Sequence, residues 1–281
     1  MILIDALKVY EEECLATQKR SDKWRYHARQ FVQRWGMWAP MSSVLSVESF
    51  RCWLGDMRQR KDAAQTIRCK AALLKACCRI ANEHGDSIDF PTRLLSTVKV
   101  ANARTEWITS DKEEKLKTLM HKSDWDILDF FLKTGFRSQE GWRLRTDDID
   151  FTEGTITVRR YKTAQLGESV VFEMSPKVRA FCLKAHKAGK EFVLNPVGLE
   201  RYECRINLGE YWKATRLRSA FDIVGIKGSL HTVRHTVGTK LANAGKDILI
   251  ISKVLGQRCL KSTQRYCHPH KKAIKSALES L

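Results

Sequence analysis

The first third of the chain repeats apolar positions at the spacing of amphipathic helices. Side chains three or four positions apart share one helical face, which must then be buried against another element. Turn signals separate the runs: residues 36–40, the polar stretch before Thr66, and residues 85–91. We therefore predict a small helical bundle over residues 1–95. The apolar positions that define its helices are Ile4, Leu7, Cys14 and Leu15; Trp24, Ala28, Phe31, Val32 and Trp35; Val47, Phe50, Trp53, Leu54 and Met57; and Ile67, Ala71, Leu74, Cys78 and Ala81.

Apolar periodicity lapses between Ser96 and Trp107. We predict a linker over residues 96–107 that joins the helical domain to a second domain, residues 108–281. Structure is predicted to resume at Ser110, three residues before Glu113, a spacing typical of a helix capping box. A further helix is expected over Trp125 to Lys133.

The apolar period changes in the middle of the second domain. Apolar and polar residues alternate there as in half-buried strands, with Glu153-Gly154 and residues 165–167 as hairpin turns. Helices are predicted to return at Ser175-Pro176 and after Thr232 and Asp247, stopping near glycines. The predicted fold class is α+β and mostly helical: a helical domain, then a larger helical domain that holds a small antiparallel sheet. The alternating apolar positions are Ile149, Phe151, Ile156, Val158, Val170, Phe172 and Met174.

The net charge of the chain indicates the class of its binding partner. The chain has 50 Lys and Arg against 32 Asp and Glu, a formal net charge of +18. Such an excess favours a polyanion, because neutralised phosphates release condensed counterions. Binding to a membrane surface would need a basic amphipathic helix or a lipidation signal, and the sequence shows neither. A membrane span would need a run of about 18 apolar residues, and the sequence has no such run. We expect a nucleic acid as partner and no membrane. A basic helix face is often only solvated, but we expect these residues of the first domain to face phosphates: Lys19, Arg20, Lys23, Arg25 and Arg68.

Nine cysteines, an odd number, are scattered through the helical patterns. Acidic residues in the opening segment argue against a secretory leader. We therefore expect reduced thiols in a cytosolic compartment. Zinc ligation by Cys259, Cys267, His268 and His270 is disfavoured because no paired CxxC accompanies them. Ligation by His231 and His235 is disfavoured as well, and no metal or cofactor is expected.

Four short stretches of the second domain carry candidate chemistry: TGFRSQE at 134–140, RRYKTAQLG at 159–167, HTVRHTVGTKLANAG at 231–245, and LGQRCLKSTQRYCHPH at 255–270. Arg137 follows a glycine turn at a helix start, a position that favours anions. Lys162 lies between two strand patterns. His231 and Arg234 share a helical face, where a proton acceptor beside a fixed cation suits a reaction at phosphate. Tyr266 near the end would supply a phenol oxygen.

Taken in order, these stretches resemble the tyrosine recombinase (phage integrase) family, whose catalytic domain holds Arg, Lys, His-x-x-Arg, His or Trp, and Tyr in that sequence. The resemblance covers about residues 107–270 and assigns catalytic positions to Arg137, Lys162, His231, Arg234, Gln257 and Tyr266. It makes Glu140 and Asp148 supporting acids, and His235 a support of the fold. One position departs: Gln257 stands where the family most often has histidine. Its amide can donate a hydrogen bond but cannot carry charge, so we expect a slower but active enzyme.

The resemblance implies a site-specific recombinase that cleaves and rejoins DNA through a 3′-phosphotyrosine link, without metal or ATP. It also implies a homotetramer on DNA that exchanges C-terminal tails, and residence in a prokaryotic cytosol or nucleoid. The helical domain starts within the first residues, so no arm-binding domain is expected before it. The apolar tail positions that predict a helix face are Ala273, Ile274, Ala277, Leu278 and Leu281.

Two other functions stay open at this point. A type IB topoisomerase uses a similar arginine, lysine and tyrosine set to relax supercoils. A DNA-binding regulator whose catalysis has lapsed is the second, and Gln257 is its only support. The residues give neither the target site nor the choice between integration, excision and resolution.

Overall fold

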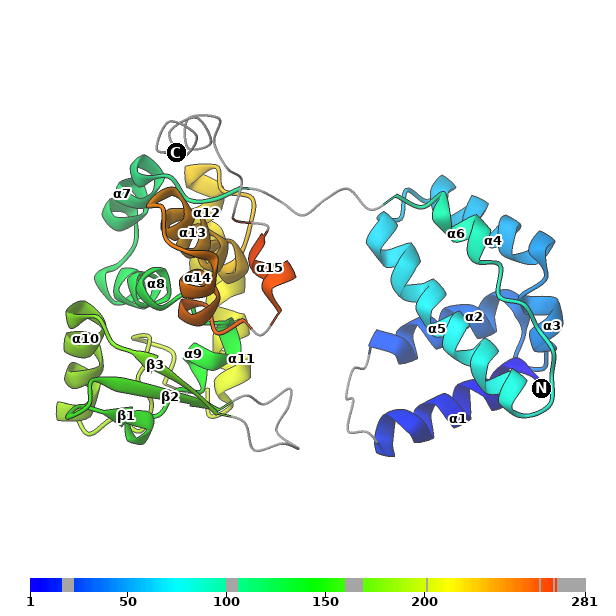
Figure 1. Cartoon of the computed structure of the whole chain (residues 1–281), viewed down its shortest axis with the longest axis horizontal. Helices are drawn as coiled ribbons and strands as arrows, with labels where there is room; N and C mark the ends of the chain where they lie inside the picture. The colour runs from blue at the N-terminus through cyan, green and yellow to red at the C-terminus, as the bar shows by residue number, and fades with distance from the viewer. Residues whose placement is uncertain are drawn as a thin grey trace, which may run out of the picture. The chain divides into compact units, whose positions relative to one another are not determined.

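The computed structural model describes residues 1–16, 23–99, 106–159, 169–200, 202–257, 259–264 and 266. The chain divides into two compact units, Met1–Ala103 and Arg104–Leu281 (Figure 1). The division falls inside the segment predicted as a linker. Val98 is buried in the core of the first unit and Ile108 in that of the second, so each unit extends a few residues into this segment.

The first unit is a helical bundle. The four long helices correspond to the four apolar runs of the sequence; one short helix lies between the second and third of them, and another follows the fourth. Their apolar faces meet around an aromatic core, in which the rings of Phe50 and Trp53 lie 5.0 Å apart. The prediction of a helical bundle is confirmed. Its helices are α1 (Leu3–Ala16), α2 (Lys23–Trp35), α3 (Met41–Val44), α4 (Val47–Gln59), α5 (Ala64–Glu83) and α6 (Thr92–Ser96).

The second unit is mostly helical and holds one small sheet. Its strands are antiparallel in the order β1-β2-β3: β1 (Ile149–Asp150), β2 (Thr155–Arg159) and β3 (Ser169–Glu173). Ile156 pairs with Phe172 and Val158 with Val170, and both β2 residues are buried. Gly154 makes the first hairpin turn with a φ of 72°. The predicted α+β fold class is therefore confirmed.

The sheet lies at one edge of the second unit, and helices build the rest of it (Figure 1). The predicted starts at Ser175 and Asp247 are confirmed, since each side chain accepts a backbone N–H of the first turn. The stretch Arg205–Val224, with a π-helical turn at Lys213–Leu217, was not predicted. The helices are α7 (Ser110–Leu119), α8 (Lys122–Thr134), α9 (Ser138–Trp142), α10 (Pro176–Lys187), α11 (Arg205–Trp212), α12 (Arg218–Val224), α13 (Leu230–Asn243), α14 (Ile248–Val254) and α15 (Leu260–Gln264), with a 3₁₀ turn at Thr146–Asp148.

One predicted cap is wrong. Helix α7 does begin at Ser110, but Thr109 occupies the N-cap position and its side chain makes no capping hydrogen bond. Glu113, expected to close a capping box, forms an ion pair with Lys240 on α13 instead. The same stretch is fixed to α13 a second time, because the Ile108 N–H donates to the Thr236 hydroxyl at 2.8 Å. These two contacts fix the start of the second unit to α13. Among the described residues, no helix has both the length and the apolar character of a membrane span.

Candidate active site

The turn after α8 presents Arg137 at the start of α9. Gly135 ends α8 in the left-handed conformation, and Arg137 is the N-cap residue of α9. The buried carboxylate of Glu140 accepts the Arg137 backbone N–H at 2.7 Å and the guanidinium Nη1 at 2.6 Å. The Arg137 side chain remains 44% exposed. A buried acid therefore fixes a cation whose head is still accessible to a ligand.

Helix α13 carries Arg234, which differs from Arg137 in that its side chain is buried. Arg234 is only 3% exposed. Its Nη1 donates to the carbonyl of Gly135 at 2.7 Å, and its Nη2 donates to the carbonyl of Leu255. A β-carbon on Gly135 would lie 2.8 Å from Leu255 Cδ2, so the glycine permits this close approach. One guanidinium thus joins the Arg137 turn, α13 and the end of α14.

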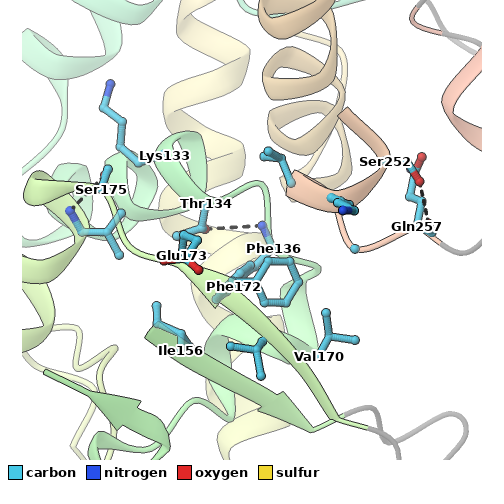
Figure 2. Close-up of a pocket in the computed structure, with 15 residues that line it drawn as sticks. Lys133, Thr134, Phe136, Ile156, Val170, Phe172, Glu173, Ser175, Ser252 and Gln257 are labelled. Carbon is cyan, nitrogen blue, oxygen red and sulfur yellow. Dashed lines mark hydrogen bonds between the residues drawn. The ribbon is translucent and has the colours of Figure 1, made fainter. Parts of the chain in front are cut away.

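The segment after Leu255 carries Gln257, held by three hydrogen bonds. Its backbone N–H donates to the Ser252 carbonyl at 2.8 Å, and its carbonyl accepts from the Ser252 hydroxyl at 2.7 Å (Figure 2). Its side-chain Oε1 accepts from the hydroxyl of Thr263, a fully buried residue, at 2.6 Å. Sequence reasoning missed Ser252 and Thr263 as supports, although Thr263 belongs to the same LGQRCLKSTQRY stretch as Tyr266.

Tyr266 lies against α13 and is 7% exposed. Its ring packs with Val237, Ile251 and Leu255 and lies 5.3 Å from the ring of His235. The His235 ring in turn meets the exposed His231 ring edge-on at 4.9 Å. Gly238 leaves room for the tyrosine ring, because a β-carbon at this position would come within 2.9 Å of it. A line of rings therefore runs from the phenol to His231.

The described part of this site brings together five predicted residues: Arg137, His231, Arg234, Gln257 and Tyr266. They stand on three segments that contact one another through Arg234, Gly135 and Leu255. The set offers an accessible cation, a buried cation, an amide, an imidazole and a phenol. Residues 106–273 match the sequence pattern of the phage integrase family.

The chain belongs to the phage integrase family. Tyrosine recombinase XerC of Syntrophus aciditrophicus is 25% identical over 227 residues, covering 77% of this chain and 73% of that protein. An integrase/recombinase of Escherichia coli is 27% identical over 319 aligned positions, covering 97% and 90%. The fold is similar to the Tn1549 transposon integrase solved with a circular intermediate DNA, with a TM-score of 0.77, 18% identity and full coverage of both chains.

Membership decides between the functions that the sequence left open. The protein is a site-specific recombinase that breaks and rejoins DNA strands. Neither the topoisomerase nor the lapsed regulator is favoured, because the relatives carry the names of recombinases and integrases.

Other residues that the family resemblance singled out lie away from these contacts or outside the described structure. Asp148 accepts the Arg145 backbone N–H at 3.0 Å and pairs with Arg159, the last residue of β2, at 3.2 Å. Lys162 lies outside the described residues. Asp148 therefore supports the root of the hairpin that carries the lysine position.

The basic residues expected to bind DNA belong to the first unit. Arg25 forms an ion pair with Glu11 at 2.8 Å, and Arg68 donates to the Val98 carbonyl at 3.0 Å. Lys19, Arg20 and the side chain of Lys23 lie outside the described part of the unit.

Proposed function

We propose that Tyr266 attacks a backbone phosphorus of double-stranded DNA and that the other site residues support this step. Arg137 and Arg234 would contact the non-bridging oxygens, where planar, permanently charged guanidinium groups offset the charge of the transition state. Gln257 would donate a further hydrogen bond to the same phosphate. His231 would accept the phenol proton, and Lys162 would protonate the leaving oxygen.

The reaction balances without an added reactant. The phenol oxygen forms a bond to phosphorus while the bond from phosphorus to the 5′ oxygen breaks. The phenol proton passes to His231, and the departing oxygen takes a proton from the Lys162 ammonium. The products are a 3′-phosphotyrosine and a free 5′-hydroxyl. The covalent link preserves the bond energy, so a 5′-hydroxyl from another strand can reverse the step without ATP.

One observation carries this proposal: the Arg234 guanidinium bonds both the turn before Arg137 and the residue before Gly256-Gln257. Tyr266 packs on the same Leu255 and on the same helix as Arg234. The guanidinium of Arg234, the amide of Gln257 and the phenol of Tyr266 therefore belong to one cluster of contacting segments. The first unit would act as the core-binding domain, with its basic helices on the phosphates that flank the cleavage site. The reaction would take place on DNA in the prokaryotic cytosol or nucleoid.

A homotetramer with exchanged tails is the assembly we propose on DNA. Lambda integrase, whose fold is similar with a TM-score of 0.73 and 15% identity over 95% of this chain, has been solved as a tetramer bound to a Holliday junction. In this chain an apolar pocket of about 630 Å³ lies between the sheet and the end of α14 (Figure 2). Phe136, Ile156, Val170, Phe172 and Val254 line it. We assign it to the apolar tail face, residues 273–281, of a second copy.

A covalent-trapping experiment tests the chemistry. The protein is incubated with a DNA library and denatured, and the DNA that remains attached is sequenced. A nicked suicide duplex is then built from the recovered site. Wild type should form a covalent band that Tyr266→Phe abolishes, whereas Tyr26→Phe, a change of an exposed tyrosine in the first unit, should retain it. No band with wild type on any DNA overturns the proposal. Robust relaxation of any plasmid would instead favour a topoisomerase.

The tail assignment has its own test. Deleting the residues after Pro269 should weaken pairing of two sites while sparing binding to a single site. Val171→Glu places a charge in the pocket lining and should do the same; Val197→Glu is the matched control, since Val171 is 60% and Val197 59% exposed. Equal effects of the two glutamates on pairing would contradict the pocket assignment.

A further inference from the structure

Gln257 presents an amide with two chemically opposite ends. Its NH₂ group donates hydrogen bonds, and its carbonyl oxygen only accepts them. A non-bridging phosphate oxygen carries negative charge, so the NH₂ end stabilises it and the carbonyl end repels it. Half a turn about the terminal torsion exchanges the two ends, and that torsion has broad, roughly two-fold preferences. A glutamine at this position therefore helps the reaction most when its orientation is already set before the phosphate binds.

The structure shows one orientation, with a neighbouring hydroxyl donating to the carbonyl end of the amide. The Thr263 hydroxyl donates to Gln257 Oε1 at 2.6 Å, and Thr263 is fully buried. The backbone of Gln257 is fixed on both sides by Ser252, so the side chain leaves from a constrained point. With Oε1 engaged by Thr263, Nε2 is the end that remains for a ligand. Tyr266 follows three residues later, and its N–H donates to the Thr263 carbonyl at 2.9 Å.

We propose that Thr263 is a positioning residue for the recombination reaction: its hydroxyl orients the Gln257 amide so that Nε2 faces the scissile phosphate. This inference rests on the proposed function of the site. It makes Thr263 a partner of the glutamine, and it explains how a neutral amide serves at the position where histidine is most common in the family. Thr263 acts through Gln257 and touches no substrate.

A double-mutant cycle tests the assignment on the full-length protein, with the nicked duplex recovered by covalent trapping. The rate of covalent adduct formation should fall about 10²-fold in Gln257→Ala, a size typical for the loss of one oxyanion donor. Thr263→Val, which keeps the shape and removes the hydroxyl, should cost roughly tenfold through misorientation. Thr263→Ser should restore the rate. The double variant Gln257→Ala with Thr263→Val should be no slower than Gln257→Ala alone.

A merely structural role for Thr263 predicts a different pattern. The two losses would then multiply in the double variant, and the thermal midpoint of Thr263→Val would fall together with its rate. Gln257→Glu adds a second readout, because a carboxylate still accepts from Thr263 but has no donor for the phosphate. It should fold as wild type and be at least as slow as Gln257→Ala.

The outcomes distinguish a failure of this inference from a failure of the proposed function on which it rests. If wild type forms no adduct, the proposed function and the inference both fail. If wild type forms the adduct and Thr263→Val matches its rate, or if the losses multiply, only the role of Thr263 is overturned.

Discussion

Two segments of the second unit each carry one arginine of the candidate site, and they hold these two arginines in opposite ways. At the start of α9, Arg137 is bound by one carboxylate and keeps 44% of its side chain exposed. On α13, Arg234 is 3% exposed, and two of its N–H groups are bonded to main-chain carbonyls. Arg137 can therefore meet a ligand without the fold depending on it. Arg234 is part of the fold as well as a cation of the site.

Arg234→Ala should have the largest effect because it removes both roles. It leaves the Gly135 and Leu255 carbonyls buried without their donor, which should lower the free energy of unfolding by about 2–4 kcal/mol. The rate of adduct formation should fall by more than about 10³-fold, since the positive charge and the two hydrogen bonds that join the segments are lost together. Denaturant unfolding and suicide-substrate trapping measure the two effects. Arg234→Lys, which keeps the charge without the fork, should recover only part of either.

Arg137→Ala should separate activity from stability. The rate of adduct formation should fall about 10²- to 10³-fold because an accessible cation is lost from the phosphate. The free energy of unfolding should fall by less than in Arg234→Ala, because the buried Glu140 carboxylate keeps the backbone N–H of residue 137 as a donor. The same two measurements apply. A loss of stability as large as that of Arg234→Ala would break the contrast between the two segments.

Gly238→Ala probes the surface of α13 on which Tyr266 rests. The new β-carbon would come within 2.9 Å of the tyrosine ring, so the ring must shift. Because reactivity depends steeply on placement, we expect the adduct to form roughly tenfold more slowly. Gly55→Ala on α4 is the control: beyond its chain neighbours and its own helix backbone, nothing lies within 4 Å of the added β-carbon. That change should leave the rate unaltered and raise stability by about 0.5–1 kcal/mol. Equal rates of adduct formation in both variants would show that the position of the Tyr266 ring on α13 is not critical.

Sequence periodicity predicted those parts of the fold whose apolar residues lie on a single face. Helices α1, α2, α4 and α5 each bury one stripe, and the pattern located all four. The stretch Arg205–Val224 escaped prediction for a physical reason. Its buried residues Leu208, Gly209 and Trp212 share one face, but the apolar side chains of half-buried Ile206 and exposed Tyr211 lie on other faces and blur the pattern. The π-helical turn at Lys213–Leu217 then shifts the register of helix α12 after it. The capping box at Ser110 failed because Lys240, 127 residues away, pairs with Glu113.

The order of the motifs predicted which residues form the candidate site but not how they are held. The His-x-x-Arg spacing predicts that His231 and Arg234 lie one turn apart on a helix, and both belong to α13, where His231 is exposed and Arg234 is buried. That the guanidinium would bond the carbonyls of Gly135 and Leu255 depends on how three distant segments pack, which no local pattern encodes. The bond from Thr263 to Gln257 is of the same kind, since it needs the chain to turn back between α14 and α15.

Arginines of the first unit extend the comparison to cations on the surface, where the smallest effects are expected. Arg25 pairs with Glu11 while both side chains are partly exposed, so the carboxylate competes with phosphate for the same guanidinium. Arg25→Ala should weaken DNA binding a few-fold and reduce the slope of log affinity against log salt by about 1, as one lost phosphate contact would.

Glu11→Gln should act in the opposite direction and strengthen binding, because it frees Arg25 from its carboxylate. Glu12→Gln is the matched control: it removes the same charge from the next position of α1, which forms no described ion pair with Arg25. Titrations of wild type and the three variants at several salt concentrations give the slopes. A gain in Glu11→Gln beyond that in Glu12→Gln measures what Arg25 contributes at phosphate. Equal gains would mean that only net charge matters here, and that Arg25 belongs to a solvated face.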